Sequence, residues 1–336
     1  MDKVVGASSA PTPGVRAPSD MKCPPPFSVN HDVRFPSNRD GVSLSASVYT
    51  PTFDASSEDD SAKRRQKENE GNARSERRSE ARGGDASGSE DASLSGHGVV
   101  IIHAHPKFGG APEMMRALAA ELASHGIRVV NLALRGAGAS GGSTSWQGDG
   151  GEVADVVTAA DYARETLRCR YVHLVGYSFG ATVAGAAVDA RDFISTYVAV
   201  AYPLGHWWSR GIFGFGAKLL MHRHTDPLKE SVKPKLFVIG TEDDFTSRGA
   251  TERFARRCCA PWDVRVYEDA DHFAFVADPF VRRVGSDIRR FIRKYRAYVD
   301  VSAPEQTSAF AEEVVEYDVW SDMYADLMSP KKRDAG

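Results

Sequence analysis

Apolar and polar positions follow two different patterns along the chain. Near the N-terminus, short alternating segments at residues 33–36 and 42–49 flank a turn at residues 38–41. Asp-Gly between two alternating segments favours a tight turn, so this pattern predicts a β-hairpin. From Gly98 onward, short apolar runs alternate with segments of helical periodicity.

The second pattern predicts the fold class. The predicted strands cover residues 99–102, 127–134, 171–175, 195–201, 235–239 and 263–267, and the predicted helices cover residues 111–124, 152–167, 179–189, 248–259 and 279–298. Strands that alternate with helices require right-handed crossovers and a mostly parallel sheet. We therefore expect an α/β fold with a doubly wound sheet, whose functional residues follow the carboxyl ends of the strands.

Composition separates this domain from the rest of the chain. Residues 1–26 are rich in Pro, Ser and Gly and read as a flexible leader. Between Phe53 and Leu94 there is no aromatic or branched aliphatic residue, so residues 53–96 are predicted to be a disordered, charged insertion in a domain of residues 27–300. The tail, residues 301–336, has enough apolar positions for a docked helix. The insertion either binds an unknown partner or merely extends a surface loop.

Overall charge and cysteine spacing exclude several classes of protein. A net charge of −3 over 336 residues gives no reason to expect a nucleic-acid partner. No apolar run is long enough to span a bilayer, and the N-terminus has no signal-peptide pattern. The four cysteines show neither disulfide nor metal-ligand spacing. These features favour a cytoplasmic protein without a cofactor.

Ser178 lies in the sequence Gly176-Tyr177-Ser178-Phe179-Gly180, between a predicted strand and a predicted helix. The two glycines allow the sharp turn that raises a serine hydroxyl above the sheet at a helix N-terminus. The N–H of Phe179 then points to the place where an oxyanion forms. This context predicts a nucleophilic serine, although the five-residue pattern alone also occurs in structural turns.

A serine nucleophile needs a base and an acid, and both follow later strands. His272 comes after the strand at residues 263–267, where the alternative is a surface-loop histidine. Glu242, Asp243 and Asp244 follow the strand at residues 235–239, and each is able to orient an imidazole. The chain order serine, acid, histidine is a known triad order, but it does not choose between the three carboxylates.

The loop after the first buried strand reads His103-Ala104-His105-Pro106-Lys107-Phe108-Gly109-Gly110. Its small and cyclic residues suit a backbone that presents a second amide to Ser178. The spacing of His103 and His105 also fits a metal pair, but no further ligands accompany it, so we expect no metal.

A glycine-rich segment at residues 136–141 fits the dinucleotide pattern G-x-G-x-x-G. No helix opens on its third glycine, and no acidic residue ends the next strand. We therefore expect a flexible loop here and no nucleotide cofactor.

Taken together, these segments resemble small bacterial-type α/β-hydrolases with H-P-H-P-x-x-G-G, R-G-x-G-x-S-x-G and G-Y-S-F-G motifs. The matching stretches are residues 103–110, 135–142, 151–155 and 176–180, and the resemblance covers residues 27–300 apart from the insertion. It implies Ser178 as nucleophile, His272 as base and Asp243 as acid, with oxyanion amides on Phe179 and His105. Ala104 stands where this group usually has proline.

The resemblance implies acyl transfer to water. An apolar cap favours an ester-type bond (carboxylester, thioester or lactone) in a small-molecule acyl substrate, and we expect this bond to be hydrolysed. Trp207, Trp208 and Phe213, within residues 201–231, are candidate substrate contacts in a small apolar cap, and ordinary helix packing explains them equally well. Two alternatives remain. One is a peptidase or amidase on the same scaffold, and the other is a non-catalytic interaction protein.

Overall fold

The computed structural model describes residues 27–52, 94, 96–148, 150–204 and 224–301. The predicted leader, nearly all of the predicted insertion, the tail from residue 302 and the candidate contacts Trp207, Trp208 and Phe213 lie outside these residues. The chain divides into two compact units, residues 1–293 and 294–336. Every described element belongs to the first unit, except the last turns of the final helix.

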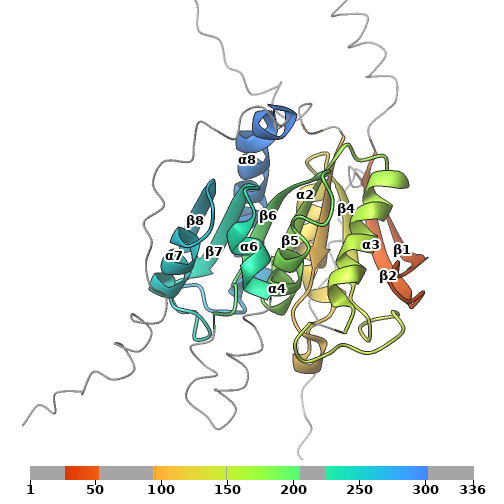
Figure 1. Ribbon diagram of the computed structural model, residues 1–336, viewed down its shortest axis with the longest axis horizontal. Coiled ribbons are helices and arrows are strands. Elements are labelled where there is room, and N and C mark those ends of the chain that lie inside the picture. Colours follow the sequence, from red (N-terminus) through yellow and green to blue (C-terminus); the bar gives the residue numbers. More distant parts are fainter. Residues whose placement is uncertain (1–26, 53–93, 95, 149, 205–223, 302–336) are drawn as a thin grey trace, which may run out of the picture. The chain divides into compact units, whose positions relative to one another are not determined.

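An eight-stranded sheet forms the centre of the first unit (Figure 1). Its strands are β1 (Phe27–Pro36), β2 (Ser43–Pro51), β3 (His97–Ile102), β4 (Arg128–Ala133), β5 (Tyr171–Tyr177), β6 (Ile194–Val200), β7 (Lys235–Gly240) and β8 (Trp262–Tyr267). Their order is β1-β2-β4-β3-β5-β6-β7-β8, with β1 and β2 antiparallel and the other six strands parallel. The predicted hairpin, the predicted strands and the α/β fold class are confirmed.

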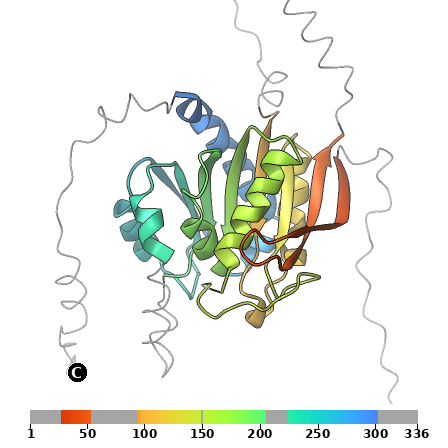
Figure 2. The same ribbon diagram turned by 45° about the vertical axis from the view of Figure 1, so that its right-hand side comes forward.

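Helices cover both faces of the sheet (Figures 1 and 2). They are α2 (Arg116–Ala123), α3 (Glu152–Glu165), α4 (Phe179–Ala186), α6 (Thr225–Glu230), α7 (Arg248–Arg256) and α8 (Phe280–Val301). The helices α3, α4 and α6 lie on one face, and α2 and α8 on the other. On the second face, Arg289 of α8 donates to Glu121 of α2 over 3.4 Å. None of the described helices combines the length and apolar character that crossing a membrane requires.

The helix α6 was not predicted from the sequence. It has only six residues and carries Pro227 in its first turn, so its own helical propensity is weak. Burial of Leu228 against α4 stabilises it: a Cβ at Gly185 would lie 3.1 Å from the Leu228 side chain. Tertiary packing therefore forms this helix where local pattern does not predict one.

The connection from β2 to β3 leaves the sheet and returns to it at the same end of the strands. Because β2 runs antiparallel to β4, Tyr49 near its end pairs with Val129 near the start of β4. The next strand, β3, begins at His97, beside Tyr171 at the start of β5. Both attachment points of this crossover thus lie at the side of the sheet where the parallel strands begin. The carboxyl ends of those strands lie at the opposite side.

Three polar side chains are buried together inside this sheet. His97 Nδ1 lies 2.9 Å from His173 Nε2, and His173 Nδ1 lies 2.8 Å from Thr196 Oγ1. All three residues are buried, on β3, β5 and β6. Desolvation, and secondarily the neighbouring His97, hold the pKa of His173 well below its ordinary value of 6.5. His173 is therefore neutral in the folded protein at mildly acidic pH.

We expect the free energy of unfolding to fall as the pH drops below about 6.5, because unfolded His173 takes up a proton that folded His173 does not. Well below pH 6.5, each such histidine contributes a slope of up to about 1.4 kcal/mol per pH unit. Urea unfolding at several pH values from 7 to 5 should give His173→Asn a slope that is shallower than wild type by up to this amount at the acidic end. His31→Asn, at an exposed position on β1, is the control. Equal slopes in His173→Asn and wild type would contradict the assignment.

Candidate active site

The turn from β5 into α4 places Ser178 in a strained backbone conformation. Its φ of 53° and ψ of −120° lie in a region that non-glycine residues rarely adopt. A Cβ at Gly176 would lie 2.4 Å from the Gly180 carbonyl oxygen, and a Cβ at Gly180 would lie 2.4 Å from the carbonyl oxygens of Ile102 and His103. The turn therefore requires glycine at both positions. It presents the Ser178 hydroxyl at the carboxyl edge of the sheet.

Ser178, His272 and Asp243 form one hydrogen-bonded chain. The Ser178 hydroxyl donates to His272 Nε2 over 3.0 Å, and His272 Nδ1–H donates to Asp243 Oδ2 over 2.8 Å. His272 and Asp243 are both buried, whereas Glu242 and Asp244 are exposed. Among the three carboxylates that the sequence left open, Asp243 is the one that contacts the imidazole. This arrangement is able to move a proton from the serine to the histidine.

Backbone amides hold the second oxygen of Asp243. Its Oδ1 accepts from the N–H of Phe245 over 2.8 Å and from the N–H of Thr246 over 2.9 Å. Thr246 is fixed in turn, since its hydroxyl donates to the Tyr202 carbonyl over 2.9 Å. Hydrogen bonds of this kind stabilise the ionised carboxylate. Asp243 is thus oriented for His272 by the turn that follows it.

Two residues that the sequence analysis missed position His272. The Tyr177 hydroxyl donates to the His272 backbone carbonyl over 2.7 Å, and the Phe245 ring stacks on the imidazole at 4.1 Å between centroids. Tyr177 is buried, and burial raises the pKa of its phenol, so it remains a donor. Tyr177 is part of the motif at residues 176–180, but no sequence pattern predicts its contact with His272, which lies 95 positions later in the chain.

The two histidines after β3 shape the loop that carries the predicted second amide. His103 Nδ1–H donates to the Ala104 carbonyl over 2.6 Å, and its Nε2 accepts from the N–H of Leu134 over 3.1 Å. Burial lowers the pKa of His103 to about 4, so this ring is neutral. His105 Nδ1 accepts from the N–H of Lys107 over 3.1 Å. Its Nε2–H donates to the Ser145 carbonyl over 3.1 Å. Backbone groups therefore engage all four ring nitrogens.

The side chains of the two residues predicted to supply the oxyanion amides contact each other. The rings of His105 and Phe179 are 4.3 Å apart between centroids. Within the described part of the chain, neither the N–H of His105 nor that of Phe179 donates to a protein acceptor. Phe179 is also the first residue of α4, so its amide belongs to the positive end of the helix dipole. The two amides therefore remain candidates for the oxyanion donors that the sequence predicts.

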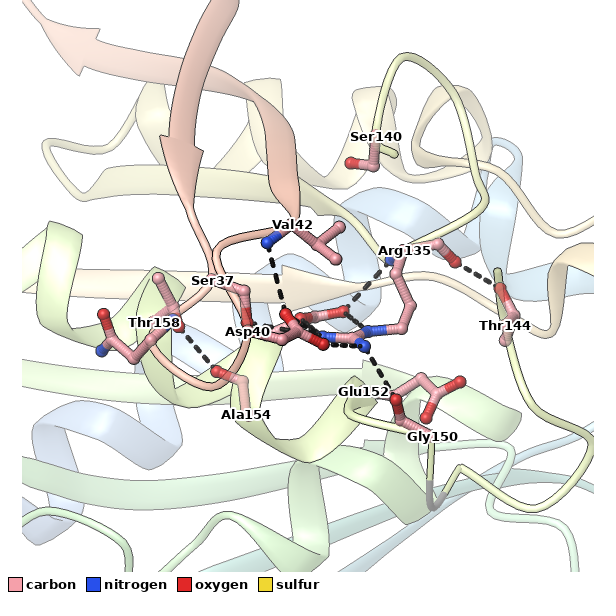
Figure 3. Close-up of polar contacts among 12 residues, drawn as sticks. Ser37, Asp40, Val42, Arg135, Ser140, Thr144, Gly150, Glu152, Ala154 and Thr158 are labelled. Carbon is pink, nitrogen blue, oxygen red and sulfur yellow. Dashed lines mark hydrogen bonds and ion pairs between the residues drawn. The ribbon is translucent and has the colours of Figure 1, made fainter. Parts of the chain in front are cut away.

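The glycine-rich loop after β4 is ordered around Arg135 (Figure 3). Arg135 Nε and Nη2 donate to the two oxygens of Asp155 over 2.8 and 2.7 Å. Its Nη1 donates to Asp40 over 2.8 Å and to the Gly150 carbonyl over 2.7 Å. The Thr144 hydroxyl donates to the Arg135 carbonyl. The flexible loop expected from the sequence is thus instead closed by a buried ion pair, which raises the pKa of Arg135 further.

Glu152 extends this network to the donor loop. Its buried carboxylate accepts from the N–H and the hydroxyl of Ser145, and the Ser145 hydroxyl accepts from the N–H of Gly150 over 3.1 Å. The Ser145 carbonyl is the acceptor for His105. His224 also donates to the Gln147 carbonyl over 2.6 Å. Glu152 therefore fixes the segment against which the His105 ring is held.

Comparison with known proteins agrees with this architecture. Residues 99–217 match the family described as the alpha/beta hydrolase fold. The fold is that of an α/β-hydrolase. No curated protein matches the chain in sequence.

Three solved structures have the same fold. An esterase from Pyrococcus furiosus is 19% identical, with a TM-score of 0.54, over 84% of this chain and 95% of that one. A serine hydrolase without lid from Xanthomonas campestris is 18% identical, with a TM-score of 0.52, over 81% and 96% of the two chains. Est1E from Butyrivibrio proteoclasticus, with ferulic acid bound, is 15% identical, with a TM-score of 0.55, over 79% and 99%. At these identities the likeness concerns the fold.

Glu152→Ala should slow the reaction of Ser178 with a fluorophosphonate probe by about tenfold or more, because the loop that carries the predicted oxyanion amide of His105 loses its support. The change removes the carboxylate that accepts from the Ser145 N–H, at a cost of about 1–3 kcal/mol in unfolding free energy.

Glu152→Gln, which keeps an acceptor for that N–H, should recover most of the labelling rate. Equal labelling rates in wild type and in a folded Glu152→Ala would refute the role of Glu152. So would a Glu152→Gln variant that is as slow as Glu152→Ala.

Proposed function

We propose that the protein is a serine hydrolase that cleaves an ester-type bond in a small-molecule acyl substrate, through an acyl-enzyme on Ser178. The observation that carries the proposal is the hydrogen-bonded chain from Asp243 through His272 to Ser178, with distances of 2.8 and 3.0 Å. A serine hydroxyl is unreactive without such a base. The strained elbow supports the same role, since it keeps the hydroxyl accessible while its partners are buried.

In the first half of the reaction, Ser178 Oγ attacks the substrate carbonyl carbon. His272 Nε2 takes the serine proton, and Asp243 stabilises the resulting imidazolium. The carbonyl oxygen becomes an oxyanion and accepts from the N–H groups of Phe179 and His105. His272 then protonates the leaving group, the carbon–oxygen bond to that group breaks, and the acyl group stays on Ser178.

In the second half, water replaces the leaving group. His272 removes a proton from this water, whose oxygen attacks the acyl carbon, and the same two amides stabilise the second oxyanion. His272 returns the proton to Ser178 Oγ as the acyl bond breaks and the acid is released. Each amide contributes about 10²- to 10³-fold to the rate of such a reaction.

Two structures of the same fold favour an ester over other acyl substrates. The Pyrococcus furiosus structure of the same fold is named an esterase, and Est1E holds ferulic acid. The four cysteines show no disulfide framework, which supports a reducing compartment such as the cytoplasm. A peptidase or amidase uses the same three residues and is the nearer alternative. A non-catalytic role is disfavoured, because it gives no physical reason for aligning all three groups.

Ser178→Ala should abolish covalent labelling by a fluorophosphonate probe and leave the fold unchanged, because the nucleophilic oxygen is removed. Intact-protein mass spectrometry measures the adduct, and circular dichroism monitors the fold. Ser143→Ala, at an exposed serine in the neighbouring loop, is the matched control and should label like wild type. An adduct that persists in Ser178→Ala would place the nucleophile elsewhere.

The bond type is tested with paired chromogenic substrates that share one acyl group. We expect hydrolysis of a p-nitrophenyl ester and little hydrolysis of the matching p-nitroanilide, with both rates lost in Ser178→Ala. A higher kcat/KM for the anilide would favour the amidase alternative. Folded protein that neither labels nor turns over any of these substrates would favour the non-catalytic alternative.

A further inference from the structure

Large apolar side chains are unusually exposed around the candidate active site. Among the described residues, four such side chains are strongly exposed: Phe108 at 58%, Trp146 at 58%, Val232 at 53% and Phe273 at 59%. Val232 lies just before β7, at the far edge of the sheet from Ser178. The other three all contact residues of the proposed machinery. Exposed apolar surface that gathers at one place marks a binding surface.

The first aromatic surface consists of Phe108 and Trp146, on two different loops. Each ring lies 5.5 Å from the His105 ring, and the two rings are 5.7 Å from each other, between centroids. The Lys107 ammonium lies 4.3 Å from the centre of the Trp146 ring. This cation–π contact and the His105 ring hold the indole beside the donor loop.

The second aromatic surface consists of Phe245 and Phe273, on the loops after β7 and β8. Phe273 lies 5.3 Å from the His272 ring and 6.0 Å from the Phe245 ring, with edge-to-face geometry in both contacts. Phe245 itself stacks on His272. The ring of the proposed base is thus packed against both members of this surface.

Each aromatic surface is connected to one of the two chain neighbours of Ser178. The preceding residue, Tyr177, contacts His272, and the following residue, Phe179, contacts His105. A leaving group has to lie beside His272, because His272 Nε2 donates its proton. Phe273, which contacts the His272 ring, is then the exposed aromatic side chain available to its substituent. The acyl substituent extends from the carbonyl carbon away from the leaving group, which leaves Phe108 and Trp146 as the exposed aromatic pair for it.

We propose that Phe108 with Trp146 binds an aromatic acyl substituent, and that Phe273 with Phe245 binds an apolar leaving group. The substrate class is then an ester with a flat apolar group on each side of the bond. This inference rests on the proposed function of Ser178. Stacked or edge-to-face ring contacts contribute enough to change kcat/KM by about three- to tenfold for each aromatic contact.

Three esters separate the two surfaces: methyl propanoate as reference, methyl 3-phenylpropanoate for the acyl side and phenyl propanoate for the leaving-group side. Trp146→Ala should lower kcat/KM for methyl 3-phenylpropanoate relative to methyl propanoate by about fivefold. Phe273→Ala should lower kcat/KM for phenyl propanoate relative to methyl propanoate by a similar factor. Val232→Ala removes an equally exposed apolar side chain away from the site and should change neither ratio.

The outcomes distinguish this inference from the proposed function. Full-length protein is used throughout, and fluorophosphonate labelling of wild type reports on Ser178 by itself. If wild type labels but both ratios are unchanged in folded Trp146→Ala and Phe273→Ala, the two surfaces do not select the substrate and the inference is overturned. It is also overturned if these variants lose activity only toward esters in phosphatidylcholine vesicles, which would make the aromatic residues a lipid-surface contact. Without labelling of wild type, the proposed function itself fails.

Discussion

The close approach of three backbone segments at Gly176 and Gly180 is the constraint on which the rest of the site depends. Strand β5, helix α4 and the end of β3 meet there with no room for a Cβ atom. As a result, Ser178 adopts an unfavourable backbone conformation. Because the strands around it are parallel, the loops after β3, β7 and β8 all emerge at the same edge. Those after β7 and β8 supply Asp243 and His272, which form the hydrogen-bonded chain to the serine.

A buried charge closes the loop after β4, which holds the His105 ring. Arg135 is almost fully buried between two carboxylates, and a buried charge that loses its partner costs several kcal/mol. The ion pair therefore resists any movement of the segment that contains Gly150 and Ser145. It also joins this segment to Asp40 in the turn between β1 and β2. The hairpin at the edge of the sheet thus contributes to the order of the donor loop, although it is far from Ser178 in sequence.

The sequence predicted those features that depend on neighbouring residues. The apolar runs give the strands, and the glycine spacing around Ser178 gives the elbow. The family resemblance implied Asp243, but the residue pattern alone did not choose between Asp243 and its neighbours, because the choice depends on burial and on the amides of Phe245 and Thr246. It predicted a flexible loop after Arg135 because the bond to Asp40 spans 95 positions. The Tyr177 contact was missed for the same reason.

The attachment of the crossover between β2 and β3 has a consequence for chain length. Both of its ends lie at the edge where the parallel strands begin, away from Ser178. The entropy lost on closing a flexible segment grows only with the logarithm of its length, so doubling the length costs about 0.6 kcal/mol. Residues added between these fixed ends therefore change the stability of the sheet little. At this edge, an insertion therefore has a low thermodynamic cost. A loop that carries His105 or His272 does not tolerate an insertion in the same way, since the position of each of its residues sets the geometry of the site.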